Sequence, residues 1–384
     1  MIRHVSQHLF FILIVLLSAC HTHKQFNSDE EEEVQVEVIV NSVQEAKKPK
    51  NVILMIGDGM GVVQISSGMY SQQGLLNLEQ IDDLVVGLHK NSSSDRLVTD
   101  SAAGATAFAC GEKTYNGAIA VNSDTIPMVT LMEIAQEKGL KTGLVATSTI
   151  THATPASFAA HNKYRKNEEA IAADMVNSGV NVMIGGGAKF FNNRETDNRN
   201  LYEEGRAKGY RVSDYFNDDF SSSLFQGTSK LLYLTAIESP LMASQGRNYL
   251  SQACKHTISF LDTLSDKGFF AVLEGSQIDW GGHANNADYI VTEMLDFDQT
   301  IGEVAEWVKR DGETLLVITA DHETGGFSIN YESVRGDSLV TSFTSDYHTA
   351  SLIPVFAVGP GAEEFTGIYE NTEIFHKIKQ LMGW

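Results

Sequence analysis

The chain has 384 residues, of which 42% are hydrophobic, and its formal net charge is −21 at pH 7. This length allows two ordinary domains or one large α/β domain, and the hydrophobic content is sufficient for a large buried core. An acidic chain repels nucleic acid, which argues against a nucleic-acid-binding role, and it repels anionic substrates unless bound metal ions reverse the local field.

The first twenty residues indicate export. A basic start precedes an apolar run from Leu9 to Leu17, which is too short to span a bilayer comfortably. The small residues before Cys20 resemble a bacterial lipobox, so we expect residues 1–19 to be a signal peptide and Cys20 to carry a lipid. The protein would then be exported and anchored to a bacterial membrane, in the periplasm or at the cell surface. A plain signal peptide with an incidental cysteine is the alternative.

An acidic segment follows the export signal. Residues 20–49 include the run Asp29–Glu33 and are expected to form a solvated tether. Two further cysteines, Cys110 and Cys254, do not make a disulfide framework. They could pair in an oxidising compartment, but each lies in an apolar helical pattern, which favours two buried thiols.

From Asn51 onward, short apolar β-branched runs alternate with longer stretches at helical spacing. This pattern predicts a three-layer α/β/α sandwich around a largely parallel sheet, within one domain of residues 50–384. Helices are predicted over Met128–Lys138 and around Ile290–Val308. The pattern weakens between 189 and 248, which we interpret as a surface insertion. The predicted strands are Asn51–Ile56, Leu84–Leu88, Thr142–Ala146, Asn181–Ile184, Phe269–Leu273, Thr314–Thr319 and Ile353–Val358.

Polar clusters follow several of these strands, where open α/β sheets bind ligands. Asp58 lies between two glycines after the first strand, and the G-x-G-x-G spacing does not fit a dinucleotide fingerprint. It is either a carboxylate presented on a tight turn or a helix cap. Thr99, Asp100 and Ser101 open a helix of small residues whose amino terminus can bind an anion. Ser101 would direct its hydroxyl at a phosphate, or one of the three residues caps the helix.

Two later clusters combine carboxylate and imidazole groups. Asp279 precedes His283 by four residues, and Asp321 is followed directly by His322. Such nitrogen and oxygen ligands suit zinc. Either pair alone is more often a surface ion pair, but both lie shortly after predicted buried strands and His348 follows later. Together they indicate metal binding.

In chain order these motifs closely resemble the alkaline phosphatases, from about residue 50 to the C-terminus. The resemblance begins with D-G-M-G after a strand and V-T-D-S-A-A-G-A-T-A at the small-residue helix. It continues through His152–Pro155, Arg165, Glu274-Gly275, Asp279–His283, Thr319–Gly326 and His348-Thr349.

The resemblance implies hydrolysis of phosphate monoesters through a phosphoserine at Ser101, with Arg165 holding the phosphate. It also implies a homodimer, two zinc ions and one magnesium ion. The first zinc would bind Asp279, His283 and His348, the second Asp58, Asp321 and His322, and the magnesium Asp58, Thr154 and Glu274. The positive charge of three divalent ions exceeds the negative charge of the four carboxylates. The surplus positive charge and Arg165 would therefore accept a phosphate dianion.

Two expected substrate-binding positions, His152 and Trp280, differ from relatives that carry Asp and Lys there. The indole of Trp280 cannot supply a positive charge, so we hypothesise weaker phosphate retention and faster product release; a packing residue is the alternative. The competing functions are a phosphodiesterase of the same superfamily and a non-catalytic phosphate-binding lipoprotein.

Overall fold

A computed structural model describes residues 48–384 of the chain. The predicted signal peptide, Cys20 and almost all of the predicted tether lie outside the described residues and stay predictions. In the part of the chain that is described, no helix is long and apolar enough to cross a membrane.

Within residues 48–384, ten strands form the central sheet in the order β14-β2-β13-β8-β1-β7-β3-β4-β6-β5. In this sheet β13 is antiparallel to both of its neighbours, and the other pairs are parallel. The strands are β1 (Asn51–Gly57), β2 (Val85–Lys90), β3 (Lys141–Thr149), β4 (Val182–Gly186), β5 (Arg211–Asp214), β6 (Leu231–Leu234), β7 (Phe269–Gly275), β8 (Thr314–Thr319), β13 (Ile353–Val358) and β14 (Gly367–Glu370). Two small antiparallel pairs lie outside this sheet, β9 (Glu323–Thr324) with β12 (His348–Thr349) and β10 (Ser328–Ile329) with β11 (Thr341–Ser342).

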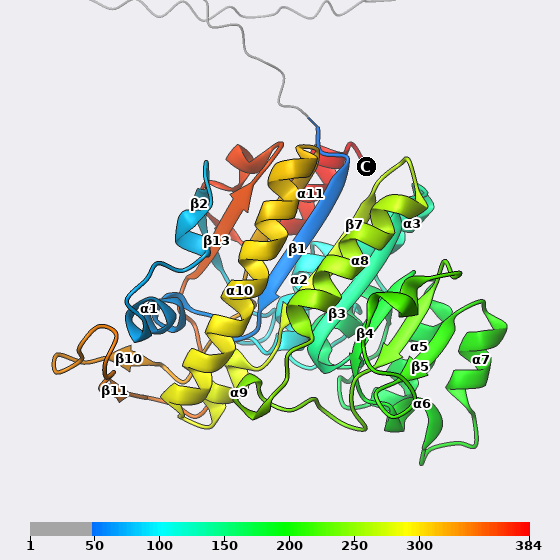
Figure 1. Ribbon diagram of the computed structural model, residues 1–384, viewed down its shortest axis with the longest axis horizontal. Helices are drawn as coiled ribbons and strands as arrows, with labels where there is room; N and C mark the ends of the chain where they lie inside the picture. Colours follow the sequence, from blue (N-terminus) through cyan, green and yellow to red (C-terminus); the bar gives the residue numbers. More distant parts are fainter. Residues whose placement is uncertain (1–47) are drawn as a thin grey trace, which may run out of the picture. The chain divides into compact units, whose positions relative to one another are not determined.

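Helices cover both faces of the sheet, as Figure 1 shows for α8 and α10 on the near face and α2, α3 and α11 behind it. They are α1 (Val62–Ser71), α2 (Ser101–Cys110), α3 (Leu131–Glu137), α4 (Ala153–Ala159), α5 (Glu168–Asn177), α6 (Lys189–Asn192), α7 (Leu201–Ala207), α8 (Leu250–Leu264), α9 (Ile278–His283), α10 (Ala287–Asp311) and α11 (Glu373–Met382). Strand β1 alternates between the faces, because Val52 and Leu54 pack into one core and Ile53 and Met55 into the other. The three-layer α/β/α prediction is confirmed.

The seven predicted strands are all present, with ends displaced by up to three residues, and α3 and α10 correspond to the two predicted helices. The interpretation of 189–248 as a surface insertion is wrong. This stretch contributes β5 and β6, which extend the parallel sheet beyond β4 at one edge. Each has four residues, and the Leu231–Leu234 run is too short to show a strand period.

The two cysteines of the described residues are both unpaired. Cys110 ends α2 and packs against the core on one face of the sheet, whereas Cys254 on α8 lies in the core on the other face. The sheet separates them, so they cannot form a disulfide with each other. Burial raises the pKa of both thiols, which keeps them protonated and unreactive. Cys110 is only partly buried, in contrast to the expectation.

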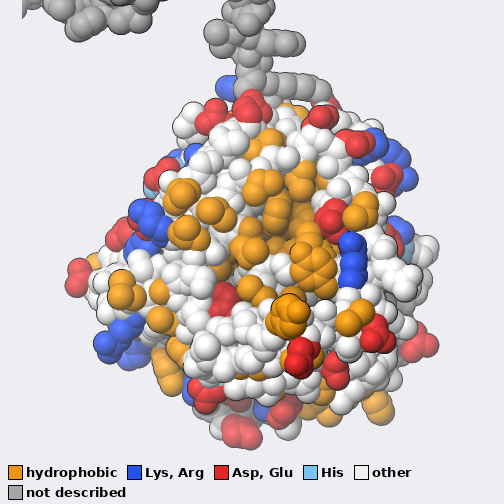
Figure 2. Space-filling view, turned by 90° about the vertical axis from the view of Figure 1, so that its left-hand side faces the viewer, with side chains coloured by type: hydrophobic (Ala, Val, Ile, Leu, Met, Phe, Trp, Pro, Cys, Tyr) orange, Lys and Arg blue, Asp and Glu red, His pale blue; other side chains and the backbone are white. Residues whose placement is uncertain are grey.

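An apolar hollow opens on the side of the domain shown in Figure 2. Its volume is about 800 Å³, and its apolar lining includes Ile81, Val85, Ala305 and Val358. Thr314, the first residue of β8, also lines it, so the hollow is at the opposite end of the sheet from the polar clusters.

Candidate active site

The polar clusters meet because the strands that carry them are neighbours. Strands β8, β1 and β7 are adjacent and parallel, so the residues at their carboxyl ends share one edge of the sheet. Asp58, Glu274 and Asp321 lie there with at most 1% of their surface exposed. Gly59 brings the next segment close, because it has a φ of 77° and a Cβ there would lie 2.6 Å from the Asp279 Cα.

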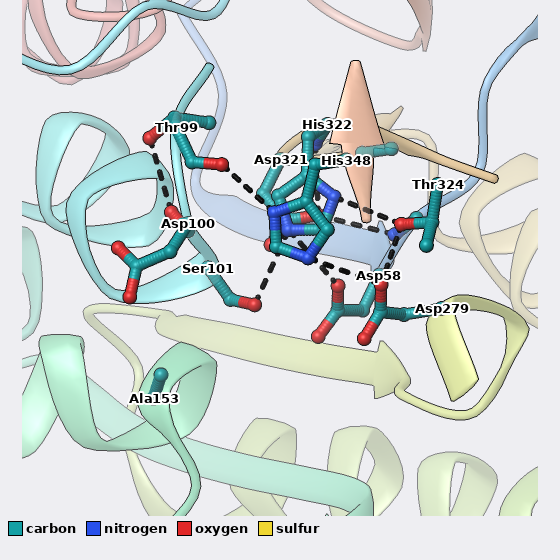
Figure 3. Close-up of polar contacts among 12 residues, drawn as sticks. Asp58, Thr99, Asp100, Ser101, Ala153, Asp279, Asp321, His322, Thr324 and His348 are labelled. Carbon is teal, nitrogen blue, oxygen red and sulfur yellow. Dashed lines mark hydrogen bonds and ion pairs between the residues drawn. The ribbon is translucent and has the colours of Figure 1, made fainter. Parts of the chain in front are cut away.

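Ser101 is the first residue of α2 and lies at this edge. The side chain of Asp100 caps the helix by accepting a hydrogen bond from the Ala103 N–H at 3.0 Å. Capping therefore falls to Asp100 and leaves the Ser101 hydroxyl free to face the other clusters. Its Oγ lies 3.3 Å from His322 Nε2, as Figure 3 shows.

Asp279, His283 and His348 form the first group of potential metal ligands, with one ligand atom of each within 4.8 Å of the others. The Nε2 atoms of the two histidines are 3.1 Å apart and lie 3.4 and 3.5 Å from the Asp279 oxygens. Each ring directs Nδ1 at a backbone carbonyl, that of Asp346 at 2.7 Å and that of Thr99 at 2.8 Å. When Nδ1–H donates to these carbonyls, both Nε2 lone pairs remain for a cation.

Asp58, Asp321 and His322 form the second group. His322 Nε2 lies 3.2 Å from Asp321 Oδ2 and 3.6 Å from Asp58 Oδ1. Its Nδ1 is 3.2 Å from Thr324 Oγ1, and that hydroxyl donates to Asp279. His322 Nδ1–H therefore donates to Thr324, and Nε2 is again the free nitrogen (Figure 3).

Asp58, Glu274 and His152 form a third group. The sequence predicted Thr154 here, and its buried hydroxyl lies beside the Glu274 carboxylate. His152 was predicted as a substrate-binding residue only. Its Nε2 lies 3.0 Å from Arg165 Nη2, and burial, followed by the charge of Arg165, lowers its pKa to about 3. His152 is therefore neutral, as a metal ligand must be.

The carboxylates at this edge fit bound cations. Both oxygens of Asp58, both of Glu274 and Asp321 Oδ2 are buried without a hydrogen-bond partner in residues 48–384. Burial raises the pKa of Glu274 to about 8 and that of Asp321 to about 7. Burial and the neighbouring Asp321 likewise raise the pKa of Asp58 well above its ordinary range. Buried carboxylates of this kind are stabilised by metal coordination, and oxygen and nitrogen donors suit zinc and magnesium.

A cleft of about 550 Å³ leads to Ser101 and is lined by Arg165, Trp280 and other residues. Arg165 is a partly buried cation: burial favours its neutral form, but Asp100 raises its pKa above the ordinary value. Trp280 stands edge-on to the His152 ring with ring centroids 6.2 Å apart. The structure thus places all twelve predicted site residues around the three groups or along this cleft.

Some residues that hold the potential ligands in place were not predicted from the sequence. Asp100 and Thr324 both lie inside the motifs, but the contact of Asp100 with Arg165 and that of Thr324 with Asp279 were not predicted. Thr99 acts through its backbone carbonyl, which no side-chain pattern can indicate. The signal for the first two was adjacency: each is within two residues of a predicted site residue.

A serine at a helix amino terminus, a partly buried arginine and three groups of potential metal-binding side chains define a candidate metal-dependent hydrolytic centre. The alkaline phosphatase family model matches residues 49–342, and the chain belongs to this family. His348 lies beyond the matched residues.

Individual relatives match a larger part of the chain than the family model does. Alkaline phosphatase 3 of Bacillus subtilis (strain 168) is 40% identical, and the match covers 89% of this chain and 92% of that protein. The alkaline phosphatase of Escherichia coli (strain K12) is 30% identical, with 88% and 87% covered. The alkaline phosphatase structure from the Antarctic bacterium TAB5 is 45% identical, with a TM-score of 0.84 and 88% and 99% covered.

Alkaline phosphatases are metal-dependent phosphoric monoester hydrolases, and this chain is an enzyme of that class. The resemblance stated from the sequence motifs is confirmed, and so is the enzyme class.

Proposed function

We propose that this chain hydrolyses phosphate monoesters to an alcohol and inorganic phosphate through a phosphoserine at Ser101. The observation that carries the proposal is the position of the Ser101 hydroxyl. It lies at the amino terminus of α2, 3.3 Å from His322 Nε2, in a cleft that also holds Arg165. Helix N–H groups and a guanidinium are suited to an anionic phosphoryl group.

We propose two zinc ions and one magnesium ion in the three groups. Zinc suits the first group, Asp279, His283 and His348, and the second, Asp58, Asp321 and His322, because each offers imidazole nitrogen. Magnesium suits the third, because the Thr154 hydroxyl adds a third oxygen donor to Asp58 and Glu274, one more than the second group offers; His152 is a further potential ligand there. Two variants of the TAB5 enzyme are described with Mg bound in a site called M3. When bound, such ions supply Lewis acidity and positive charge.

The side chains then have separate roles in the reaction. The Ser101 hydroxyl gives up its proton to solvent, and its oxygen attacks phosphorus in line with the leaving alcohol oxygen. The ester P–O bond breaks, and the leaving oxygen takes up a proton to give the alcohol. Arg165 donates its planar pair of N–H groups to two phosphoryl oxygens and fixes their orientation. A water molecule then attacks the phosphoserine and returns the Ser101 hydroxyl. Deprotonated nucleophiles favour alkaline pH.

A phosphodiesterase of the same superfamily is the second candidate. Arg165 favours monoesters, because a diester has one of the oxygens that the guanidinium pairs with blocked by a second substituent. A non-catalytic phosphate-binding lipoprotein would not need the Ser101 hydroxyl.

Release of p-nitrophenol from p-nitrophenyl phosphate and from bis-p-nitrophenyl phosphate separates these candidates. Both are measured across pH for the wild type and Ser101→Ala, with and without chelator and added zinc. We expect monoester turnover to dominate at alkaline pH, to need metal and to collapse in the variant. Preference for the diester, or an active Ser101→Ala, would overturn the assignment.

We also propose that the chain is exported, carries a lipid on Cys20 and forms a homodimer. The motif before Cys20 supports the lipid, and membership of the alkaline phosphatase family supports the homodimer. Labelling with a radioactive fatty acid should require Cys20, with Cys20→Ser as the control. Light scattering of the purified protein gives the mass of the assembly.

A further inference from the structure

Glu323 directly follows His322, and the residue is only 5% exposed. One oxygen, Oε1, accepts hydrogen bonds from Gln64 Nε2 at 2.8 Å and from the Phe327 N–H at 3.1 Å. The other, Oε2, accepts from the Gly326 N–H at 3.2 Å and from the Thr349 hydroxyl. Four donors thus satisfy a buried carboxylate, which leaves it no need of a cation.

The donors come from segments that carry metal ligands in the proposed function. Gln64 is on α1, the helix that begins four residues after Asp58. Thr349 directly follows His348 on β12, which pairs with β9. One carboxylate therefore ties the segments of Asp58, His322 and His348 to one another.

The start of α1 is shaped for this contact. A Cβ on Gly61 would lie 2.4 Å from Glu323 Cγ, so glycine is required for the two segments to approach this closely. Gln64 Nε2 also donates to the Thr324 carbonyl at 2.8 Å, which adds a second tie between α1 and the segment that follows His322.

A small number of contacts hold the segment around His348 in position. The strand β12 has two residues and follows an irregular stretch that holds only the short strands β10 and β11. Other contacts that hold His348 include its own Nδ1 on the Thr99 carbonyl and the Tyr347 carbonyl, which accepts from the Gly325 N–H at 2.9 Å. The rings of His322 and Tyr347 stack on the His348 ring, and the Thr349 hydroxyl on Glu323 is the side-chain hydrogen bond made by the residue that follows His348.

We propose that Glu323 is a positioning residue: its carboxylate, through Thr349, sets where His348 lies relative to Asp58 and His322. It thereby fixes the geometry of the first metal group against the second. This inference rests on the proposed function, because it assumes that His348 is a zinc ligand. Groups that orient metal ligands contribute about 10–100-fold to metal affinity.

Thr349→Val removes the hydrogen bond from Thr349 to Glu323 with little change in the shape of the side chain. Thr349→Ser keeps the hydroxyl. Zinc affinities are measured by competition with a chromophoric chelator, and metal per chain by mass spectrometry. We expect Thr349→Val and Glu323→Gln to lower the affinity for one of the two zinc ions about tenfold or more. The affinities of Thr349→Ser should be close to those of the wild type. Ser351→Ala is the matched control, because Ser351 Oγ contacts the same Thr349 hydroxyl from the other side.

The double variant, Glu323→Gln with Thr349→Val, separates positioning from a general loss of stability. If the two residues act through one contact, its effect on zinc affinity is smaller than the product of the single effects. Unchanged affinities in Thr349→Val, equal weakening of both zinc ions, or multiplicative effects would each overturn the inference. A wild type that binds no zinc would instead overturn the proposed function.

Discussion

Arg165 is held by the residue that precedes the proposed nucleophile, since its Nη1 lies 2.9 Å from Asp100 Oδ2. The second oxygen of Asp100 accepts from the Ala103 and Gly117 N–H groups, both at 3.0 Å. Asp100 therefore joins the amino terminus of α2 to the guanidinium. The Asp100 carboxylate, together with the contact of Arg165 with His152, sets the distance between Ser101 and Arg165.

Asp100→Asn should weaken phosphate retention. The amide keeps one acceptor oxygen for the helix but loses the charge that holds Arg165, so the guanidinium becomes mobile. We expect the inhibition constant for phosphate to rise about tenfold, as for loss of one charged hydrogen bond. Steady-state inhibition of p-nitrophenyl phosphate hydrolysis measures it. Asp95→Asn is the control, because Asp95 bonds the Asn116 N–H but not Arg165; an equal rise in both variants would contradict the explanation.

Trp280→Lys should tighten phosphate binding. Trp280 lines the cleft with Arg165 and carries no charge, whereas a lysine could reach the phosphate through water. A partly solvated charge of this kind contributes about 1 kcal/mol, so we expect an inhibition constant about fivefold lower and slower product release.

Trp280→Met separates charge from size in this experiment, because it opens the same space without a positive group. Tighter inhibition in the lysine variant alone supports the hypothesis. An unchanged inhibition constant in Trp280→Lys would mean that Trp280 is a packing residue on the wall of the cleft.

The fold was predictable where the apolar runs were long. Strands such as β1 and β8 are buried on both faces and read as continuous β-branched runs. The four-residue strands β5 and β6 gave no such signal, and they belong to the sheet because β6 pairs with β4 and β5 pairs with β6. Their assignment depends on tertiary pairing, which no local pattern contains.

The proposed ligands were predictable because they have distinctive side chains, several of them shortly after a strand, as with Asp58 and Asp321. The residues that orient them were not. Thr324 acts by a hydroxyl between His322 and Asp279, which are 43 residues apart in the chain, and Glu323 acts on Thr349. Such contacts depend on the packing of distant loops, so sequence order alone cannot give them.

The metal-free protein should lose stability as pH rises. Burial raises the pKa of Glu274 from an ordinary 4.5 to about 8 and that of Asp321 from 3.8 to about 7. Between these values the folded state binds more protons than the unfolded state, so the free energy of unfolding falls as pH rises from about 4 to 8. We expect a fall on the order of a few kcal/mol in urea unfolding of chelator-treated protein.

Glu274→Gln tests the origin of this slope. The amide is neutral at every pH, so the metal-free variant should show a shallower fall across the same interval. Added zinc and magnesium should offset the fall in the wild type, because cations bind the ionised carboxylates. A slope that neither Glu274→Gln nor added metal changes would place the titrating groups elsewhere in the protein.

Arg247 anchors the segment after β6 to α10 through a buried ion pair. Its Nη2 lies 2.6 Å from Glu293 Oε2 and 2.7 Å from Asp296 Oδ2, and the side chains of Arg247 and Glu293 are each 2% exposed. Arg247→Met leaves Glu293 buried without its cation, so we expect a loss of about 3 kcal/mol in the free energy of unfolding. Urea unfolding at fixed zinc and magnesium concentrations measures it.

The exposed pair of Lys309 and Asp82 is the matched comparison, with side chains 65% and 75% exposed and a separation of 2.9 Å. Lys309→Met should change the free energy of unfolding by at most about 0.5 kcal/mol, because water screens this pair. Adding Glu293→Gln to Arg247→Met should recover part of the loss, since the amide removes the uncompensated charge. If the second substitution instead deepens the loss, the Arg247 guanidinium acts through its packing and its bond to the Leu241 carbonyl rather than through charge.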